Sequence, residues 1–358
     1  MFVIGTAGHV DHGKSTLVRA ITGIDPDRLQ EEKDRGMTID LGFAWFSLPG
    51  GQEISIVDVP GHEKFVNNML AGIAGIDMAM LVVAADEGVM PQTREHLAIL
   101  DLLKIPVGIV VLSKIDLVDD EWVDLVTMDI EELTEGSVLE DSSVYPVSAE
   151  TGAGIEDLID AIDEMFATSE NRPDNGRPRL PVDRAFTVSG FGTVVTGTLL
   201  DGSLEIGQEI EMSPSGHKGR IRGLQSHKKK ENMVLPGTRV AANISGIDQD
   251  QIRRGEVLTV PGWLRSSEAF DVKLDVLDDV PNTLSHNMFV TLHTGSSEVI
   301  ARLRLLEDDK GEPGFSYWAQ IKPNTSTPVV KGDYFVIRSN MTTLGGGVVV
   351  DTHAKRHR

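Results

Sequence analysis

The residues best suited to chemistry lie near the N-terminus, where positions 8–15 read GHVDHGKS and fit the phosphate-binding pattern G-x-x-x-x-G-K-[ST]. An apolar run at 2–4 precedes them and a helix-like stretch at 17–21 follows, which is the strand–loop–helix context that the pattern requires. Because glycines let successive N–H groups face an anion, the loop predicts a nucleoside triphosphate site, with Lys14 at the β- and γ-phosphates and Ser15 on Mg²⁺. The phosphate-binding residues of this loop are expected to be His12, Gly13, Lys14, Ser15 and Thr16.

Three later motifs each follow an apolar run, at the places where strands of an α/β sheet would end. Asp58 follows the run 54–57, where an acidic residue suits a second Mg²⁺ contact. Asp116 follows the run 107–112, and its carboxylate can accept hydrogen bonds from N1–H and N2–H₂ of guanine, whereas adenine would leave it unpaired. Together with the pair 148–149, these motifs predict binding of GTP rather than ATP. The expected guanine-binding residues are Ser113, Lys114, Asp116, Ser148 and Ala149.

The length and composition limit which classes of protein and site are possible. A chain of 358 residues can form two or three domains, each with its own core. It has no cysteine, which excludes disulfides, thiol catalysis and cysteine-based zinc sites. No apolar run is long enough to span a membrane, and the sequence starts directly in an apolar strand without a basic-then-apolar leader. We therefore expect a cytoplasmic protein with no membrane partner.

The pattern of elements changes near residue 170. Before it, short apolar runs alternate with helix-like segments, which is typical of a doubly wound, mostly parallel sheet. After it, short strands separated by turn residues are typical of small antiparallel barrels. The sequence thus predicts an α/β P-loop GTPase domain followed by two antiparallel β-barrel domains. The expected divisions are 1–170 for the GTP-binding domain, 171–179 for a linker, 180–265 for the first barrel and 268–358 for the second.

The formal charge of −22 is unevenly distributed. The segment 116–171 holds 18 acidic residues and no lysine or arginine, so it is a poor candidate for contact with RNA. A solvated, solubilising face is the simplest interpretation of that segment. The segment 216–230, in contrast, is basic and contains no acid. It predicts either a hairpin that contacts phosphate or a solvated loop.

Several motifs resemble those of the translation-factor GTPases, which include elongation factor Tu. They are GHVDHGK at 8–14, RGMTI at 35–39, DVPGH at 58–62, GTVVTG at 192–197 and GGGVV at 345–349. Within that superfamily, the segments 27–42, 62–70 and 181–188 are similar to the family of selenocysteine-specific elongation factors. The resemblance covers essentially the whole chain. It implies a ribosome-stimulated GTPase that uses GTP/GDP and Mg²⁺, binds selenocysteyl-tRNA in its GTP state and delivers it to the ribosome.

The resemblance also assigns roles around the phosphates. It implies that Thr38 joins Ser15 and Asp58 at Mg²⁺ and senses the γ-phosphate, so that loss of this phosphate frees the loop. It further implies that Asp11 lies near the phosphates and that the Gly61 N–H contacts the γ-phosphate.

A catalytic role is implied for His62, which matches the histidine that positions the attacking water. Val10 and Met37 match a hydrophobic gate that keeps this histidine away until the ribosome moves it. The chain departs from the family pattern at Ser113, where an asparagine is usual, and we expect one contact to guanine or to the phosphate loop to be weaker there.

The matching selenocysteine pocket consists of Asp183, Arg184 and Arg239 in the first barrel. Two arginines would favour a selenolate over neutral serine, because a selenol is more acidic than a thiol, whose pKa lies near ~8.5. The alternative is that either arginine forms an ordinary salt bridge of the barrel.

Two other functions remain open from the sequence alone. One is a general aminoacyl-tRNA elongation factor or an initiation-factor γ-like GTPase, and the other is the GTPase subunit of sulfate activation. Members of the selenocysteine family also bind an mRNA hairpin through C-terminal modules. The chain stops at Arg358, just past the second predicted barrel, so we do not expect these residues to carry that recognition.

Overall fold

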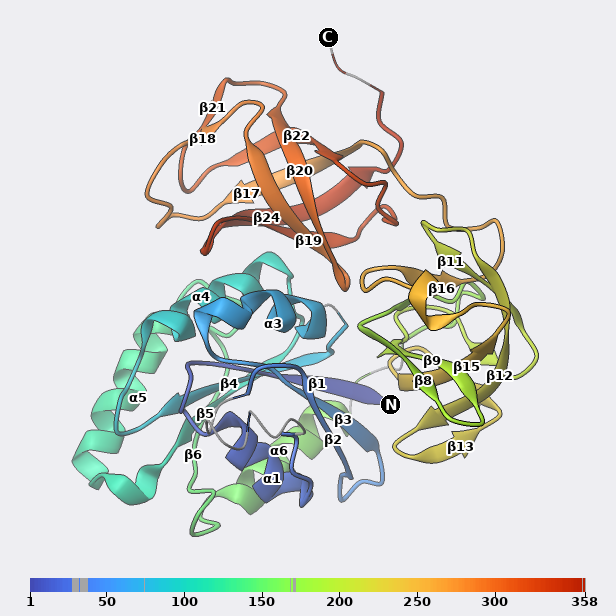
Figure 1. Cartoon of the computed structure of the whole chain (residues 1–358). Coiled ribbons are helices and arrows are strands. Elements are labelled where there is room, and N and C mark those ends of the chain that lie inside the picture. The colour runs from blue at the N-terminus through green and yellow to red at the C-terminus, as the bar shows by residue number, and fades with distance from the viewer. Residues whose placement is uncertain are drawn as a thin grey trace. The chain divides into compact units, whose positions relative to one another are not determined.

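The computed structural model of the chain describes residues 1–27, 32, 38–73, 75–167, 169, 172–355 and 357. The chain divides into two compact units, Met1–Asn171 and Arg172–Arg358, and each is described by itself (Figure 1). Met37 of the predicted gate lies outside the described residues, as do positions 28–31 and 33–36 of the segment that resembles the family's first switch.

The first unit contains a six-stranded sheet in the order β2-β3-β1-β4-β5-β6. All neighbouring pairs are parallel except β2–β3, so the predicted mostly parallel sheet is confirmed. Its strands are β1 (Phe2–Ala7), β2 (Gly42–Ser47), β3 (Glu53–Asp58), β4 (Met78–Ala84), β5 (Gly108–Ser113) and β6 (Val144–Pro146). The central strands read as continuous apolar runs because both faces of the sheet are covered.

Helices pack on both faces of this sheet (Figure 1). They are α1 (Lys14–Thr22), α3 (Val66–Ile73), α4 (Pro91–Leu102), α5 (Asp120–Thr134) and α6 (Ile155–Ala167). The start of α5 is capped by the Asp119 carboxylate, which accepts from the Trp122 N–H at 2.9 Å. The core on one face joins Leu17 of α1 and Phe166 of α6 to strand residues such as Ile4 and Ile56. The P-loop therefore leaves the end of a buried strand and runs into a helix held against the sheet.

The second unit begins with an antiparallel sheet in the order β7-β16-β11-β12-β15-β9-β8, with β13 added beside β12. Its strands are β7 (Leu180–Pro181), β8 (Arg184–Val188), β9 (Gly192–Thr198), β11 (Glu209–Ser213), β12 (Lys218–Ser226), β13 (Lys229–Glu231), β15 (Arg239–Ser245) and β16 (Val257–Thr259). A short pair, β10 (Leu204–Glu205) and β14 (Met233–Val234), lies apart from it. The sheet curls until its first strand lies beside β9, because a Cβ added to Gly197 of β9 would be 2.2 Å from the Pro181 carbonyl oxygen of β7.

The rest of the second unit is a closed antiparallel barrel in the order β17-β22-β20-β19-β23-β24. Its strands are β17 (Phe270–Val276), β19 (Phe289–Thr294), β20 (Ser297–Leu305), β22 (Ser316–Pro323), β23 (Tyr334–Ser339) and β24 (Thr342–Asp351), with the separate pair β18 (Leu284–Ser285) and β21 (Lys310–Gly311). The fold class predicted from the sequence is thus confirmed. The division into three domains and a linker at the stated residues stays a prediction. Among the described residues, no helix has the length and apolar character needed to cross a membrane.

Candidate functional site

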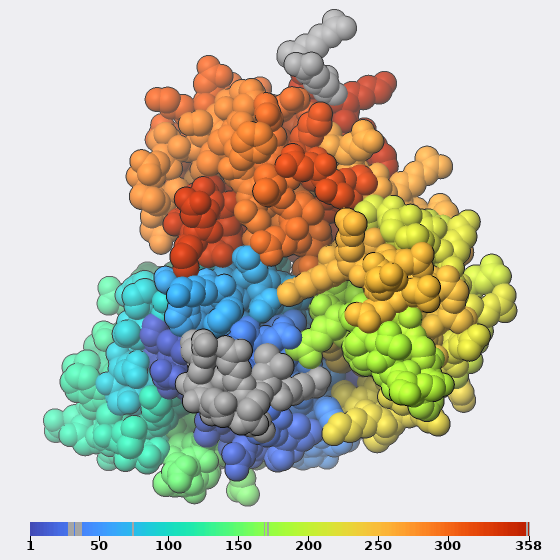
Figure 2. All heavy atoms as spheres, in the orientation of Figure 1, coloured from blue at the N-terminus to red at the C-terminus, as the bar shows by residue number. Residues whose placement is uncertain are grey.

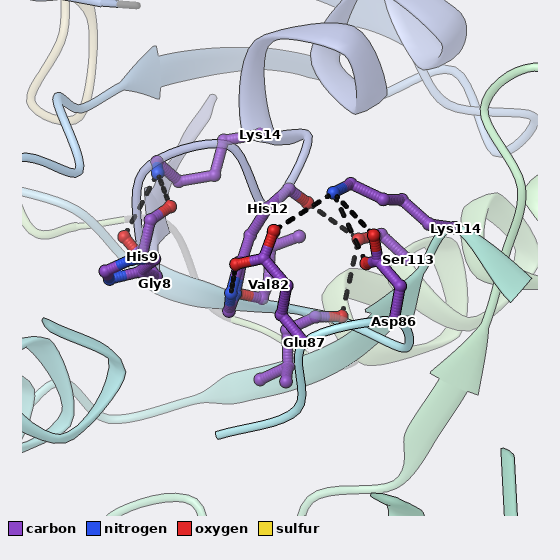
Figure 3. A network of polar contacts seen from close by, with 10 residues as sticks. Gly8, His9, His12, Lys14, Val82, Asp86, Glu87, Ser113 and Lys114 are labelled. Atoms are coloured by element: carbon purple, nitrogen blue, oxygen red, sulfur yellow. Dashed lines mark hydrogen bonds and ion pairs between the residues drawn. The ribbon is translucent and has the colours of Figure 1, made fainter. Parts of the chain in front are cut away.

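The P-loop is held in place by contacts to its own backbone and to distant strands (Figure 3). Gly8 has φ +129° and lies so close to β4 that an added Cβ would be 2.2 Å from the Val82 carbonyl oxygen, so only glycine fits there. Its N–H donates to His96 Nδ1 of α4 at 2.9 Å. The Lys14 ammonium donates to the carbonyls of Gly8 (3.0 Å) and His9, and burial lowers the pKa of Lys14 to about 8. A γ-phosphate is the kind of partner that would stabilise the charged form of this buried lysine.

The His12 ring points away from the phosphate side of the loop. The residue is fully buried, and its Nδ1 lies 3.3 Å from the Val82 carbonyl oxygen. Burial lowers the pKa of His12 to about 4, so the ring is neutral at pH 7. A phosphate contact from His12 would therefore come from the backbone and not from the imidazole.

Ser113 at the end of β5 binds the P-loop directly. Its Oγ donates to the His12 carbonyl at 2.6 Å, and the residue is buried (Figure 3). The sequence predicted a weaker contact at this position because asparagine is usual there. The serine hydroxyl nevertheless keeps a link between the base-binding strand and the phosphate loop.

Replacing Ser113 by alanine should weaken GTP and GDP binding together, because the buried His12 carbonyl loses its donor. Leaving such a group unsatisfied costs about 1–3 kcal/mol. Isothermal titration with both nucleotides would measure the effect. Ser142→Ala is the matched control, since its Oγ also donates to a backbone carbonyl, that of Gly108 at 3.0 Å, at the start of the same strand. Equal nucleotide affinities for the two variants would show that Ser113 does not position the loop.

Oxygen donors suited to a hard cation converge beside Lys14. Ser15 Oγ donates to Asp58 Oδ2 at 2.7 Å and lies 2.8 Å from Thr38 Oγ1. Thr38 Oγ1 in turn donates to Asp27 Oδ1 at 3.0 Å, and Thr6 Oγ1 donates to Asp58 Oδ1 at 2.8 Å. Two hydroxyls and a carboxylate match the donors that Mg²⁺ prefers. The three predicted metal residues therefore lie together, and Asp27 and Thr6 are additions that no local sequence pattern indicated.

Asp58 itself is fully buried at the end of β3. Burial raises the pKa of its carboxyl to about 6, although the hydrogen bonds from Ser15 and Thr6 and the charge of Lys14 act in the opposite direction. A divalent cation at this place would stabilise the ionised form. In the described part of the chain, no group of three or more histidine or acidic side chains is arranged to hold a metal ion.

The DVPGH motif packs against the P-loop at Gly61. A Cβ on Gly61 would be 2.4 Å from Lys14 Nζ and 2.6 Å from the Val10 nitrogen, so the backbone at this position touches the phosphate loop. His62 begins a short 3₁₀ turn, Glu63–Phe65, and its Nδ1 accepts from the Lys64 N–H at 3.2 Å. That bond assigns the proton of the neutral ring to Nε2, which is the nitrogen left to meet a substrate. The roles of His62 and of the gate stay predictions.

The base-binding motifs come together at the ends of β5 and β6. The Ile115 N–H donates to the Val147 carbonyl at 3.3 Å, which ties the loop of Asp116 to the loop of Ser148. Asp116 is exposed and free to face a ligand, whereas Ser148 is buried. A pocket of about 300 Å³ joins this region to the P-loop. It is lined by Ser15, Thr16, Arg19, Ala20, Asp25, Asp27, Ala149 and Glu150.

Lys114 is held by two acidic residues that the sequence did not single out. The residue has φ +59°, and its ammonium lies 3.3 Å from Asp86 and 3.7 Å from Glu87, in the loop after β4 (Figure 3). These contacts fix the position of the Lys114 ammonium.

In the second unit, the three residues of the predicted selenocysteine pocket are close neighbours on the sheet. Both terminal nitrogens of the Arg239 guanidinium, Nη1 and Nη2, donate to the Asp183 carboxylate, the bond from Nη2 at 2.9 Å, and Thr196 Oγ1 donates to Asp183 Oδ1 at 2.7 Å. Arg184 pairs with Thr196 across β8–β9, and Arg239 pairs with Thr198 across β15–β9. The two arginines thus flank β9 on the same face of the sheet, and Asp183 orients one of them.

Family models match almost the whole chain. The model for the elongation factor Tu GTP-binding domain matches residues 1–168, and that for elongation factor Tu domain 2 matches 192–259. The model for the β-barrel domain of selenocysteine-specific elongation factor matches 271–356.

Similar proteins carry the same name. The selenocysteine-specific elongation factor of Desulfomicrobium baculatum is 46% identical over 99% of this chain and 56% of its own length, and that of Methanocaldococcus jannaschii is 32% identical over 97% of this chain and 79% of its own length. The crystal structure of elongation factor SelB from Methanococcus maripaludis, in complex with the GTP analogue GppNHp, superimposes with a TM-score of 0.85 at 29% identity, covering 98% of this chain and 79% of that one. The chain spans little more than half the length of the bacterial relatives it matches. Because of these matches, and in agreement with the geometry of the site, the chain belongs to the family of selenocysteine-specific elongation factors.

Proposed function

We propose that this chain binds GTP with Mg²⁺, binds selenocysteyl-tRNA in its GTP state, delivers it to the ribosome and hydrolyses GTP there. The nucleotide part rests on the convergence of Lys14, Ser15, Asp58 and Thr38 beside a pocket that reaches the base-binding loops. The similar structure from Methanococcus maripaludis was determined with a GTP analogue.

The phosphate site would act mainly by positioning and charge. Lys14 would bind the β- and γ-phosphate oxygens, and the N–H groups at the start of α1 would face the same anion. Ser15, Thr38 and Asp58 would hold Mg²⁺, which supplies charge neutralisation for the transferring phosphoryl group. His62 would orient the attacking water from the loop that Gly61 packs against Lys14. Thr38 would sense the γ-phosphate. Its hydroxyl contacts Ser15 beside the proposed Mg²⁺ site, and its loop would be released when hydrolysis removes the γ-phosphate.

The preference for selenocysteine over serine would come from the two arginines of the first barrel, Arg184 and Arg239. The observation that carries this proposal is that Asp183 holds the Arg239 guanidinium in place while Thr196 holds Asp183. A preorganised guanidinium loses little freedom when it binds an anion. A selenolate is such an anion at neutral pH, whereas a serine hydroxyl is not. With Arg184 on the other side of β9, two positive charges would face one selenolate.

The remaining expectations follow family membership. We infer that the protein works in the cytoplasm and that an mRNA hairpin is bound by residues outside this chain. The other functions considered from the sequence, a general elongation or initiation factor and a sulfate-activation GTPase, have no feature of the site in their favour.

Binding of selenocysteyl-, seryl- and cysteinyl-tRNA to the GTP-analogue-loaded and GDP-loaded protein tests the proposal. Tight binding is expected only for selenocysteyl-tRNA and only with the analogue. Equal affinity for all three tRNAs would indicate a general elongation factor, and no dependence on tRNA at all would reject the translational role.

A further inference from the structure

The most basic surface element of this acidic protein is the hairpin formed by β12 and β13. Its turn residues His227 and Lys228 both have positive φ, 50° and 61°, as in a tight two-residue type I′ turn. Residues 216–230 include eight lysine, arginine or histidine residues and no acid. In Figure 2 this yellow segment lies on the surface of the second unit. The hairpin thus presents exposed positive charge, with Glu231 at the end of β13 as its one acid.

Part of this charge is already neutralised within the sheet. Arg220 lies 2.9 Å from Glu209, and Lys218 lies 4.0 Å from Glu211, both on the neighbouring strand β11. Arg222 and Lys230 are exposed, and no carboxylate of the described residues lies within 4.0 Å of either. Positive charge without a carboxylate partner among the described residues therefore remains at these two positions on the hairpin.

The strand register places Lys230 on the same face of the sheet as the pocket arginines. Directly paired residues run across five strands, from β8 through β9, β15 and β12 to β13, in the order Arg184, Thr196, Ala241, Gln225, Lys230. Paired residues point to the same side of a sheet, and the neighbouring row, which includes Val195, Ala242 and Leu224, is buried in the core. Four strand spacings separate the two cationic ends, which corresponds to about 19 Å along the curved surface of the sheet.

The face between these ends is suited to an extended polyanion. Its central residues in the row are Thr196, Ala241 and Gln225, which are small or uncharged. This step rests on the proposed function: an aminoacyl group in the pocket is esterified to the 3′-terminal ribose, so the adjoining phosphates start beside the pocket, and this face of the sheet offers them a path to the hairpin. We propose that Arg222 and Lys230 bind phosphates of the 3′-terminal single strand of the aminoacyl-tRNA, and that the hairpin is a second, sequence-independent contact beyond the pocket.

The salt dependence of tRNA binding tests this contact. Each phosphate contact to a single strand contributes about 0.7 to the slope of log K against log salt concentration, so Arg222→Gln with Lys230→Gln should reduce the slope by about 1.4. The loss should be equal for selenocysteyl- and seryl-tRNA, since phosphates are common to both. Arg220→Gln is the matched control, because that arginine is on the same strand and already paired with Glu209, and it should keep the slope of the unmodified protein. Thermal unfolding of all three proteins checks that the barrel is intact.

Two outcomes would overturn the proposal. One is an unchanged slope in the double variant. The other is that the double variant and the unmodified protein still differ in slope when the tRNA is deacylated and lacks its single-stranded 3′ end. The phosphates bound by the hairpin would then belong to another part of the RNA. The ratio of selenocysteyl- to seryl-tRNA affinity reports the proposed function separately. If the protein does not prefer selenocysteyl-tRNA but the double variant shows the expected decrease in slope, the hairpin contact is supported and the proposed selenocysteine specificity is rejected.

Discussion

Replacing His62 by alanine should reduce ribosome-stimulated GTP hydrolysis by about 10²-fold or more, while GTP affinity changes by no more than a few-fold. The expected size is that of a positioned catalytic side chain. GTP affinity should survive because the proposed phosphate contacts come from Lys14 and the P-loop backbone, and the neighbouring Gly61 would remain in place. Single-turnover hydrolysis on ribosomes with equilibrium nucleotide binding measures both quantities.

A structural role of His62 can be separated from a catalytic one. Its Nδ1 accepts from the Lys64 N–H and caps the turn 63–65, so alanine removes a cap as well as a ring. Asparagine is a good capping residue and lacks the imidazole. If His62→Asn restores hydrolysis, His62 serves only to shape the loop. If hydrolysis stays low in both variants, the ring itself is required.

The part of the site that could be predicted from the sequence is the part with local spacing. Lys14 and Ser15 belong to one short motif, and Asp58 follows a run of buried apolar residues. The strands of the first sheet were recognisable for the same reason, since all seven residues of Met78–Ala84 are apolar and buried. Continuous apolar runs of this kind are typical of parallel strands covered on both faces.

The contacts that could not be predicted join residues distant in the chain. The Gly8 N–H of the P-loop donates to His96, which is 88 positions away on α4, and Lys114 is held by the loop of Asp86. His12 lies in the phosphate-binding motif, yet its ring faces the interior, because the direction of a side chain depends on what packs beside it. Two-residue strands such as β10 and β18 also carry no period that a sequence pattern can reveal.

The second large effect is expected on the selectivity for selenocysteyl-tRNA over seryl-tRNA. Arg239→Ala should weaken binding of selenocysteyl-tRNA roughly tenfold to hundredfold, because a hydrogen bond to a charged group contributes about 1.5–3 kcal/mol. Binding of seryl-tRNA should barely change, since serine presents no anion. The measurement is a pair of dissociation constants, for the two tRNAs, at one fixed salt concentration.

The structure makes the choice of controls for this measurement specific. Arg239→Ala leaves the buried Asp183 carboxylate without its guanidinium, which lowers the stability of the barrel whatever the function. The double variant Arg239→Ala with Asp183→Asn removes that uncompensated charge, and the ratio of the two tRNA affinities on one protein cancels any loss of folded molecules. Arg184→Ala removes the second cation and should lower the same ratio. If all three proteins lose affinity for both tRNAs in parallel, the arginines support the barrel and the selenolate pocket must be sought elsewhere.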